Sequence, residues 1–370
     1  MPVNLALGHV SNDFLIAALV IYSLSVVAFA GDFAFGRPRR ADSAARGQQA
    51  RERAGALAQV GAASVAAAGE GPPDGVTVPP GPAVPTGRAA AAAGDQVAVP
   101  DSMPEVAVPP LRAIAQAGPW VQAAVALAAV GVVAHTVAVV TRGLAVHRAP
   151  WGNMYEFVTA LTCVAAIFFL FVMVRYRAWT LGVFVMGAVV VALGLAETLI
   201  YTAAGQLVPA LQSYWLDIHV TAMTLATGIF FVAAVLGVIY LWVDRHARRV
   251  AAGRALPGNE IVRRLPSIEQ LDRLTYRTIM FGFPVWTFGV IAGAIWADQA
   301  WGRYWGWDPV ETWAFITWVL YAAFLHARAT AGWRGRRAHY IQLLGFASLI
   351  FNIMVVQVFI TGLHSYAGVS

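Results

Sequence analysis

Lysine is absent from this 370-residue sequence, so all 25 of its basic residues are arginines. Charge is scarce as well: 12% of the residues are charged, 59% are hydrophobic and the mean hydropathy is +0.65. Several apolar runs reach the roughly 20 residues that cross a bilayer. The basic balance does not indicate nucleic-acid binding, because the arginines cluster between the apolar runs. We therefore expect an all-α, polytopic membrane protein with membrane lipid around it and no nucleic-acid partner.

Cysteine is nearly absent too. The single Cys163 lies inside an apolar run. This excludes a disulfide framework and a CxxC redox pair. The chain therefore cannot cycle dithiols by itself.

Aromatic residues are missing from residues 36–119, which are rich in Ala, Gly and Pro. Such a stretch cannot bury a core, so we expect a disordered cytoplasmic linker. The linker separates a first transmembrane helix within residues 1–35 from a transmembrane domain over residues 120–370.

Eight apolar runs predict membrane-spanning helices. All but three of the 25 arginines fall in alternate connecting segments. The positive-inside rule then places both termini outside the cytoplasm. The first run is followed, not preceded, by its arginines, which argues against a cleaved signal peptide. The predicted spans are roughly 14–34, 120–140, 154–174, 180–200, 216–243, 278–296, 310–327 and 340–363.

Tryptophan, in contrast, is concentrated: six of the thirteen lie between Trp296 and Trp318. Gly302 and Gly306 interrupt this stretch, and glycines would let a flat ligand approach the backbone. Asp308, Pro309 and Glu311 form a helix start with a capping box. An interfacial aromatic belt explains one or two tryptophans. Six with paired glycines favour an aromatic ligand-binding shelf on the outer face, made of Trp296, Trp301, Tyr304, Trp305, Trp307 and Asp308.

Two other outer segments carry candidate residues. The segment 147–157 contains a turn and a helix start at Asn153, and places Trp151, Tyr155 and Glu156 at the outer surface. From these residues alone, a ligand contact and an ordinary turn with an aromatic anchor are equally compatible. His219 begins the fifth predicted span and His364 follows the eighth, so the topology brings both to the outer face.

Two neutral imidazoles can ligate a haem iron from opposite sides, and aromatic planes pack on a porphyrin. Zinc is the rival ligand, but it takes further Cys, His or carboxylate ligands and does not explain the tryptophans. Haem b accounts for both the histidines and the shelf. Arg303 lies within the shelf and is expected to contact a propionate, whereas the outer position of Arg142 is ascribed to chance.

On the predicted inner side, His326 and the basic segment 244–277 each allow two interpretations. His326 falls in the inner half of the seventh span, where a histidine is a functional candidate and a boundary residue is the competing interpretation. The basic segment 244–277 is either an amphipathic surface helix or, more simply, a loop that sets the topology. Gln342, Asn352 and Gln357 fit interhelical hydrogen bonding better than ligation.

The sequence WADQAWGRYWGWDPVETWAFITW resembles the tryptophan-rich WWD signature of haem-handling proteins of cytochrome c biogenesis. Within them it is similar to the CcsA/ResC type of the two-component system II, labelled CcsB in actinobacteria. The segments NMYEF, LQSYWLDIHV, FLHAR and GLHSY support that subclass. These matches cover the second to the eighth predicted spans.

The resemblance implies transmembrane haem delivery and presentation for thioether attachment to the CXXCH cysteines of apocytochrome c. His219 and His364 match the external axial ligands. His326 matches an intramembrane ligand whose partner histidine belongs to a ResB-type protein. The resemblance assigns no catalytic residue, and holocytochrome c synthase (haem lyase) activity is expected only with that partner. Val310 departs from the lysine of many relatives, and the linker is unusually long.

Two other functions compete with this interpretation. One is a haem-binding membrane chaperone that passes haem to a separate ligase. The other is a plain transporter with an aromatic belt, which would show no Soret band.

Overall fold

The computed structural model describes residues 3–36, 110–205, 213–254, 260–330 and 332–364. Most of the predicted linker, residues 37–109, lies outside these ranges, while its last part forms the short helix α3. Eight helices in the described residues are long and apolar enough to cross a membrane, which confirms the predicted number and the all-helical fold. The helices are α1 (Leu5–Phe35), α3 (Pro110–Gln116), α4 (Pro119–Val146), α5 (Met154–Tyr176), α6 (Gly182–Leu199), α7 (Tyr214–Ala251), α8 (Glu260–Arg264), α9 (Ile268–Trp301), α10 (Pro309–Ala329), α11 (Arg336–Phe351) and α12 (Gln357–Phe359).

The helices start where the sequence supplies caps. Asn153 accepts the N–H of Glu156 at the start of α5, and Ser213 accepts that of Trp215 at the start of α7. At α10, Asp308 is the N-cap, Pro309 is the first helical residue, and the predicted capping box is present.

The predicted start of the sixth span was wrong. Helix α9 has 34 residues and begins at Ile268, ten residues before the predicted span. Residues 268–277 therefore form neither a separate surface helix nor a loop. Their charges lowered the hydropathy of this segment, but Asp272 pairs with Arg328 on α10 at 2.8 Å, which allows the helix to continue.

The last span also differs from a plain helix. After α11 the backbone widens into a π-helical turn over Asn352–Val356, and α12 follows. Such turns often occur at functional sites. This one lies beside the cavity described below.

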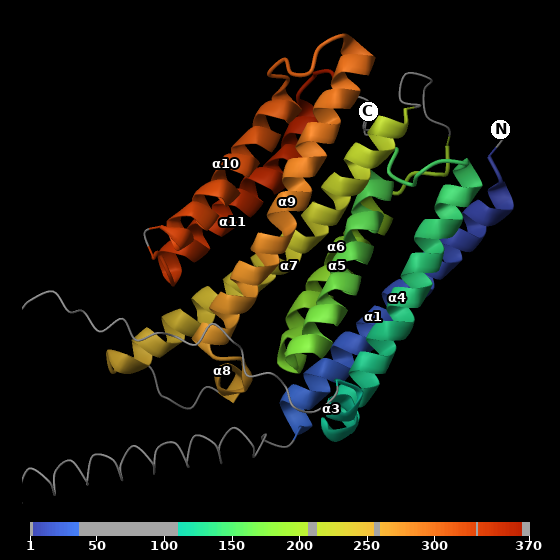
Figure 1. Ribbon diagram of the computed structural model, residues 1–370. Coiled ribbons are helices and arrows are strands. Elements are labelled where there is room, and N and C mark those ends of the chain that lie inside the picture. Colours follow the sequence, from blue (N-terminus) through green and yellow to red (C-terminus); the bar gives the residue numbers. More distant parts are fainter. Residues whose placement is uncertain (1–2, 37–109, 206–212, 255–259, 331, 365–370) are drawn as a thin grey trace, which may run out of the picture. The chain divides into compact units, whose positions relative to one another are not determined.

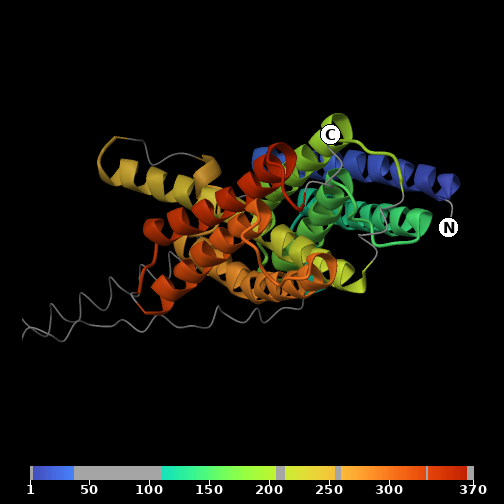
Figure 2. The same ribbon diagram turned by 90° about the horizontal axis from the view of Figure 1, so that it is seen from above.

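Helices α1 and α4 run side by side and pack against α5 and α6 (Figures 1 and 2). Lipid tails are as apolar as leucine side chains, so close packing and hydrogen bonds hold such helices together. Ser11 and Ser25 of α1 donate to the carbonyls of Ala138 and Ala124 on α4, each at 2.8 Å. Gly131 of α4 lies against the ring of Tyr22, in space that a Cβ would fill.

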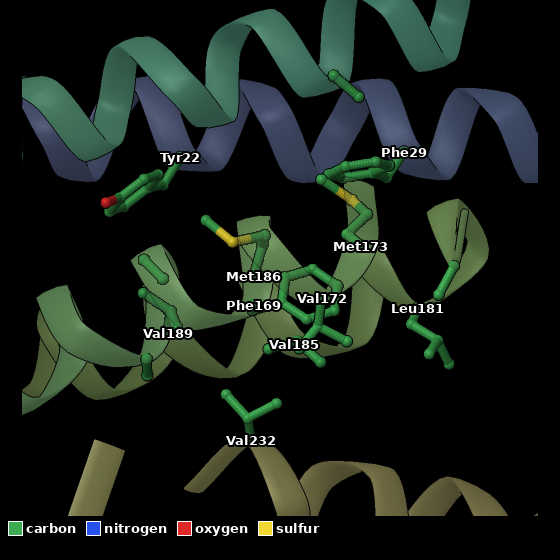
Figure 3. Close-up of a cluster of buried hydrophobic side chains, with 14 of the residues drawn as sticks. Tyr22, Phe29, Phe169, Val172, Met173, Leu181, Val185, Met186, Val189 and Val232 are labelled. Carbon is green, nitrogen blue, oxygen red and sulfur yellow. The ribbon is translucent and has the colours of Figure 1, made fainter. Parts of the chain in front are cut away.

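Figure 3 shows the large side chains that α1, α5, α6 and α7 bury between them, including Phe29, Phe169, Met173 and Met186. A second cluster joins α7, α9, α10 and α11. At its centre Phe230 stacks on Tyr321, with ring centroids 3.9 Å apart. This second cluster supports the floor of the functional site.

Candidate functional site

One cavity gathers the segments that the sequence assigned to the outer face. It holds about 1350 Å³ of empty space, including its opening to solvent. Its walls come from the α4–α5 connection, the start of α7, the second half of α9, the start of α10 and the end of the chain's last span.

His219 lines this cavity from the first turns of α7. Its Nδ1 lies 2.7 Å from the carbonyl oxygen of Gly289 on α9. A carbonyl only accepts, so Nδ1 carries the proton and the lone pair of the neutral ring is on Nε2. Gly293 lets α9 approach this closely, because a Cβ there would lie 2.6 Å from the His219 ring. The imidazole is therefore fixed in tautomer and orientation by α9.

His364 lines the same cavity from beyond α12. Its Nδ1 donates to Oδ2 of Asp308 at 2.9 Å, which again leaves the neutral lone pair on Nε2. The N–H of Leu363 donates to the other carboxylate oxygen at 2.7 Å. A carboxylate that holds the distal nitrogen of a ligating histidine is a common arrangement at metal sites.

Asp308 lies just before α10 and is buried. Burial alone raises the pKa of its carboxyl, but the hydrogen bonds from His364 and the Leu363 N–H outweigh burial and hold the pKa below its ordinary value of 3.8. Asp308 is therefore a carboxylate at neutral pH. It caps α10 and orients His364 at the same time.

Most of the predicted aromatic shelf borders the cavity, as does Trp151. Trp296 is buried and meets Trp301 edge to face, with centroids 4.8 Å apart. Trp301 in turn lies 5.1 Å from the ring of His364. The lining aromatic residues of the shelf are Trp296, Trp301, Tyr304 and Trp305.

Trp307 does not line the cavity. It is 63% exposed and packs edge to face on Trp305 and Phe315. Its φ of 58° is in the left-handed region, which a bulky residue rarely adopts. The left-handed backbone at Trp307 directs its side chain onto Trp305 and Phe315, outside the cavity.

The two glycines serve the loop rather than a ligand. Gly302 ends α9 with a φ of 70°, in the left-handed conformation that glycine adopts at helix ends. Gly306 leaves space for the guanidinium of Arg303, which a Cβ would overlap. Arg303 is not among the residues that line the cavity.

Glu311 anchors the tryptophan loop by accepting two of its backbone N–H groups. Its Oε2 accepts the N–H of Gly306 at 2.9 Å and that of Asp308 at 3.1 Å. The capping box thus anchors the tryptophan loop as well as starting the helix.

Next to the cavity, two outer arginines form a buried ion cluster with Glu156. Arg142 Nε and Arg148 Nη1 lie 2.9 and 2.8 Å from the two carboxylate oxygens, and the N–H of Gly152 donates to the same group. Arg142 is 4% exposed, so its position is not chance. Tyr155 and Glu156 were expected at the surface, but both are buried. Glu156 can be buried because the two arginines pair with it. The cluster fixes the turn from which Trp151 reaches the cavity.

His326 lies far along α10 and is exposed, away from the cavity. It shares its helix face with Phe315, Val319 and Ala323, which are also exposed. Two residues later, Arg328 turns inward to Asp272.

The sequence interpretation missed several lining residues. Trp286, Val290 and Gly293 precede Trp296 at helical spacing within the predicted span 278–296, so the periodicity of that span could have placed them on the face of Trp296. Asp217 precedes His219 by two residues. Asn352 and Gln357 line the cavity too, although they were expected only to bridge helices.

The residues that line the cavity fit haem. Two imidazoles with fixed Nδ1 protons can ligate its iron, and the aromatic lining can pack on its ring. Within the described ranges, no group of three or more His, Cys, Asp or Glu residues could hold a metal ion such as zinc.

Fold and cavity together define a multi-pass membrane protein with paired imidazoles in an aromatic cavity. Residues 151–364, which begin at the Trp151 turn and end at the cavity histidine, match the protein family described as "Cytochrome C assembly protein". The chain belongs to this cytochrome c assembly family, and within it to the CcsA type.

Its relatives include the cytochrome c biogenesis proteins CcsA of Guillardia theta and Gloeobacter violaceus. The first is 37% identical over 248 residues, covering 62% of this chain and 81% of the relative. The second is 37% identical over 211 residues, covering 45% and 62%. A solved structure titled "Cytochrome c Heme Lyase CcmF" shows a weak likeness, with a TM-score of 0.46 and 20% identity over 66% of this chain and 43% of that chain.

Proposed function

We propose that this protein delivers haem b across the membrane and presents it in the cavity, with His219 and His364 as axial ligands. The observation that supports this best is that both imidazoles line one aromatic cavity with Nδ1 held by an acceptor. Haem bound there would supply the vinyl groups that form thioethers with the CXXCH cysteines of apocytochrome c. The chain's own residues orient the ligand nitrogens and shield the site from water.

Residues around the two histidines have different roles in this proposal. Gly289 and Asp308 fix the two rings, and the ion cluster around Glu156 holds Trp151 against the opening. Arg303 is proposed to contact a propionate by turning from Gly306, since no arginine of the described residues lines the cavity. The arginine distribution supports placing the cavity on the extracytoplasmic side of a bacterial plasma membrane.

His326 supplies half of a second, intramembrane site in this proposal. A histidine on an otherwise apolar, exposed helix face is costly in lipid, and a partner helix removes that cost. The partner is a ResB-type protein that contributes the second imidazole. A thiol-reducing membrane protein keeps the apocytochrome cysteines ready for attachment.

The test is co-expression with the ResB-type partner and a reporter cytochrome c, followed by measurement of mature cytochrome and of haem in the purified complex. His219→Ala and His364→Ala should abolish maturation, and added imidazole should restore part of it by replacing the missing nitrogen. His326→Ala should lower the haem content of the complex. His246→Ala, on the part of α7 remote from the cavity, is the matched control and should behave as wild type.

Wild-type maturation in both cavity variants would show that the outer site is misassigned. Haem-loaded complex that matures cytochrome only after a further ligase is added would favour the chaperone function instead. A purified complex with no Soret band would exclude both.

A further inference from the structure

A second set of buried polar residues runs along α11, separate from the cavity histidines. The buried side of α11 and of the π-helical turn after it carries His339, Gln342, Ser348 and Asn352, with Gly345 between them; these residues are called the buried face below. Their exposures are 1%, 0%, 5% and 4%. From His339 to Asn352 the face extends for about 20 Å, at 1.5 Å per residue, which is most of the roughly 30 Å hydrocarbon core.

Protein partners satisfy only part of this face. His339 Nε2 lies 3.2 Å from Oδ1 of Asp272, which Arg328 also binds. Ser348 meets Thr317 of α10 at 2.9 Å. Asn352 donates to the carbonyl of Val310 at 3.2 Å.

Other polar atoms of this region have no partner among the described residues, although they are buried. They are His339 Nδ1, both polar atoms of the Gln342 amide, the Tyr321 hydroxyl and Asn352 Oδ1. Natural proteins pair nearly all buried polar groups, many of them with ordered water. Five such atoms on this segment and the facing Tyr321 therefore favour a hydrogen-bonding partner other than protein.

Along this segment, Asp272 and His339 lie at one end, Gln342 follows, the Tyr321 ring lies against Gly345, and Asn352 borders the cavity at the other end. Gly237 of α7 leaves space for the Gln342 amide: a Cβ there would overlap Gln342 Nε2 and would lie 3.5 Å from His339 Nδ1.

We propose that this face binds a file of internal water molecules and passes protons between the Asp272 end and the cavity. Water is the partner that supplies both donors and acceptors to a histidine, an amide and a phenol. Buried chains of His and acidic residues carry protons in other membrane proteins. This inference does not depend on haem binding.

The first measurement is X-ray hydroxyl-radical footprinting of the purified full-length protein, which labels side chains next to bound water. Tyr321 should be labelled several-fold faster than Tyr22. Tyr22 is the matched control because it is equally buried, and its hydroxyl lies 3.5 Å from His135. Equal rates for the two tyrosines would overturn the proposal.

The second measurement is proton flux into liposomes that contain the protein, driven by an imposed pH gradient. Gln342→Leu should reduce the flux several-fold and slow the labelling of Tyr321. An apolar side chain of similar size removes two unmet polar atoms, so the variant should fold. Gln122→Leu, whose side chain hydrogen-bonds the carbonyl of Ala115 in an exposed setting, is the control and should leave the flux unchanged. Fast labelling without any protein-dependent flux would overturn the proton path.

Discussion

The carboxylate of Asp308 offers a direct test of how the outer histidine is held. It accepts hydrogen bonds from the His364 ring, the Leu363 N–H and the Val310 N–H. Asp308→Asn keeps the size of the side chain but leaves one accepting oxygen. If the amide nitrogen faces the ring, it donates to Nδ1 and the proton moves to Nε2, the atom needed for iron. The variant therefore presents the wrong tautomer.

The magnitude follows from the bonds lost. A hydrogen bond to a charged group contributes about 1.5–3 kcal/mol, and outer partners of metal ligands typically change affinity by 10–100-fold. We expect Asp308→Asn to weaken haem binding by about 10–100-fold, less than the loss of the ring in His364→Ala. The assay is titration of purified protein with haem, followed at the Soret band.

The titration is best done between about pH 7 and pH 8. The pKa of folded Asp308 is below its ordinary value, so its stabilising contribution is present above that value and is lost only as the pH falls through the lower folded pKa. At neutral pH the carboxylate is fully charged, so titration of Asp308 does not contribute to the difference between variants. Asp298→Asn, the same charge change on a residue that does not line the cavity, is the control. Equal affinities for Asp308→Asn and wild type would refute the assigned role of Asp308.

Three further changes probe other parts of the site. Gly293→Ala should displace His219 and lower haem affinity at least tenfold in the same titration, whereas Gly194→Ala, whose Cβ meets nothing within 4 Å, should not. Arg142→Ala should destabilise the protein by about 1.5–3 kcal/mol in thermal unfolding, because Glu156 loses one charged partner but keeps Arg148; a change as small as that of an exposed arginine would contradict the cluster. Arg303→Ala should loosen haem about tenfold while leaving the bis-histidine spectrum intact, and an unchanged affinity would remove the propionate contact.

The sequence predicted the parts of the fold that depend on local composition. Apolar runs give the number of spans, and Asp308-Pro309 with Glu311 gives a helix start, because capping acts within four residues. Counting spans also placed His219 and His364 at the same end, where the structure joins them in one cavity.

Ion pairs between residues that are far apart in the sequence could not be predicted from the sequence alone. Arg142 and Glu156 are near span ends, where charged residues usually face water, and only the packed structure shows that they are buried together. Asp272 lowers the apolar character of its segment, although Arg328, 56 residues later, neutralises it. The direction of Trp307 depends on one backbone angle that composition does not specify.

The hydrogen bond between Asp308 and His364 also determines when the cavity can be completed during protein synthesis. The two residues are 56 positions apart, and the α10–α11 hairpin lies between them. At 5–20 residues per second, a ribosome needs roughly 3–11 s to synthesise that interval. During it, the nascent chain has its tryptophan loop but not the histidine that completes the cavity. The site closes only after the last span has inserted, so a prematurely terminated chain never acquires it.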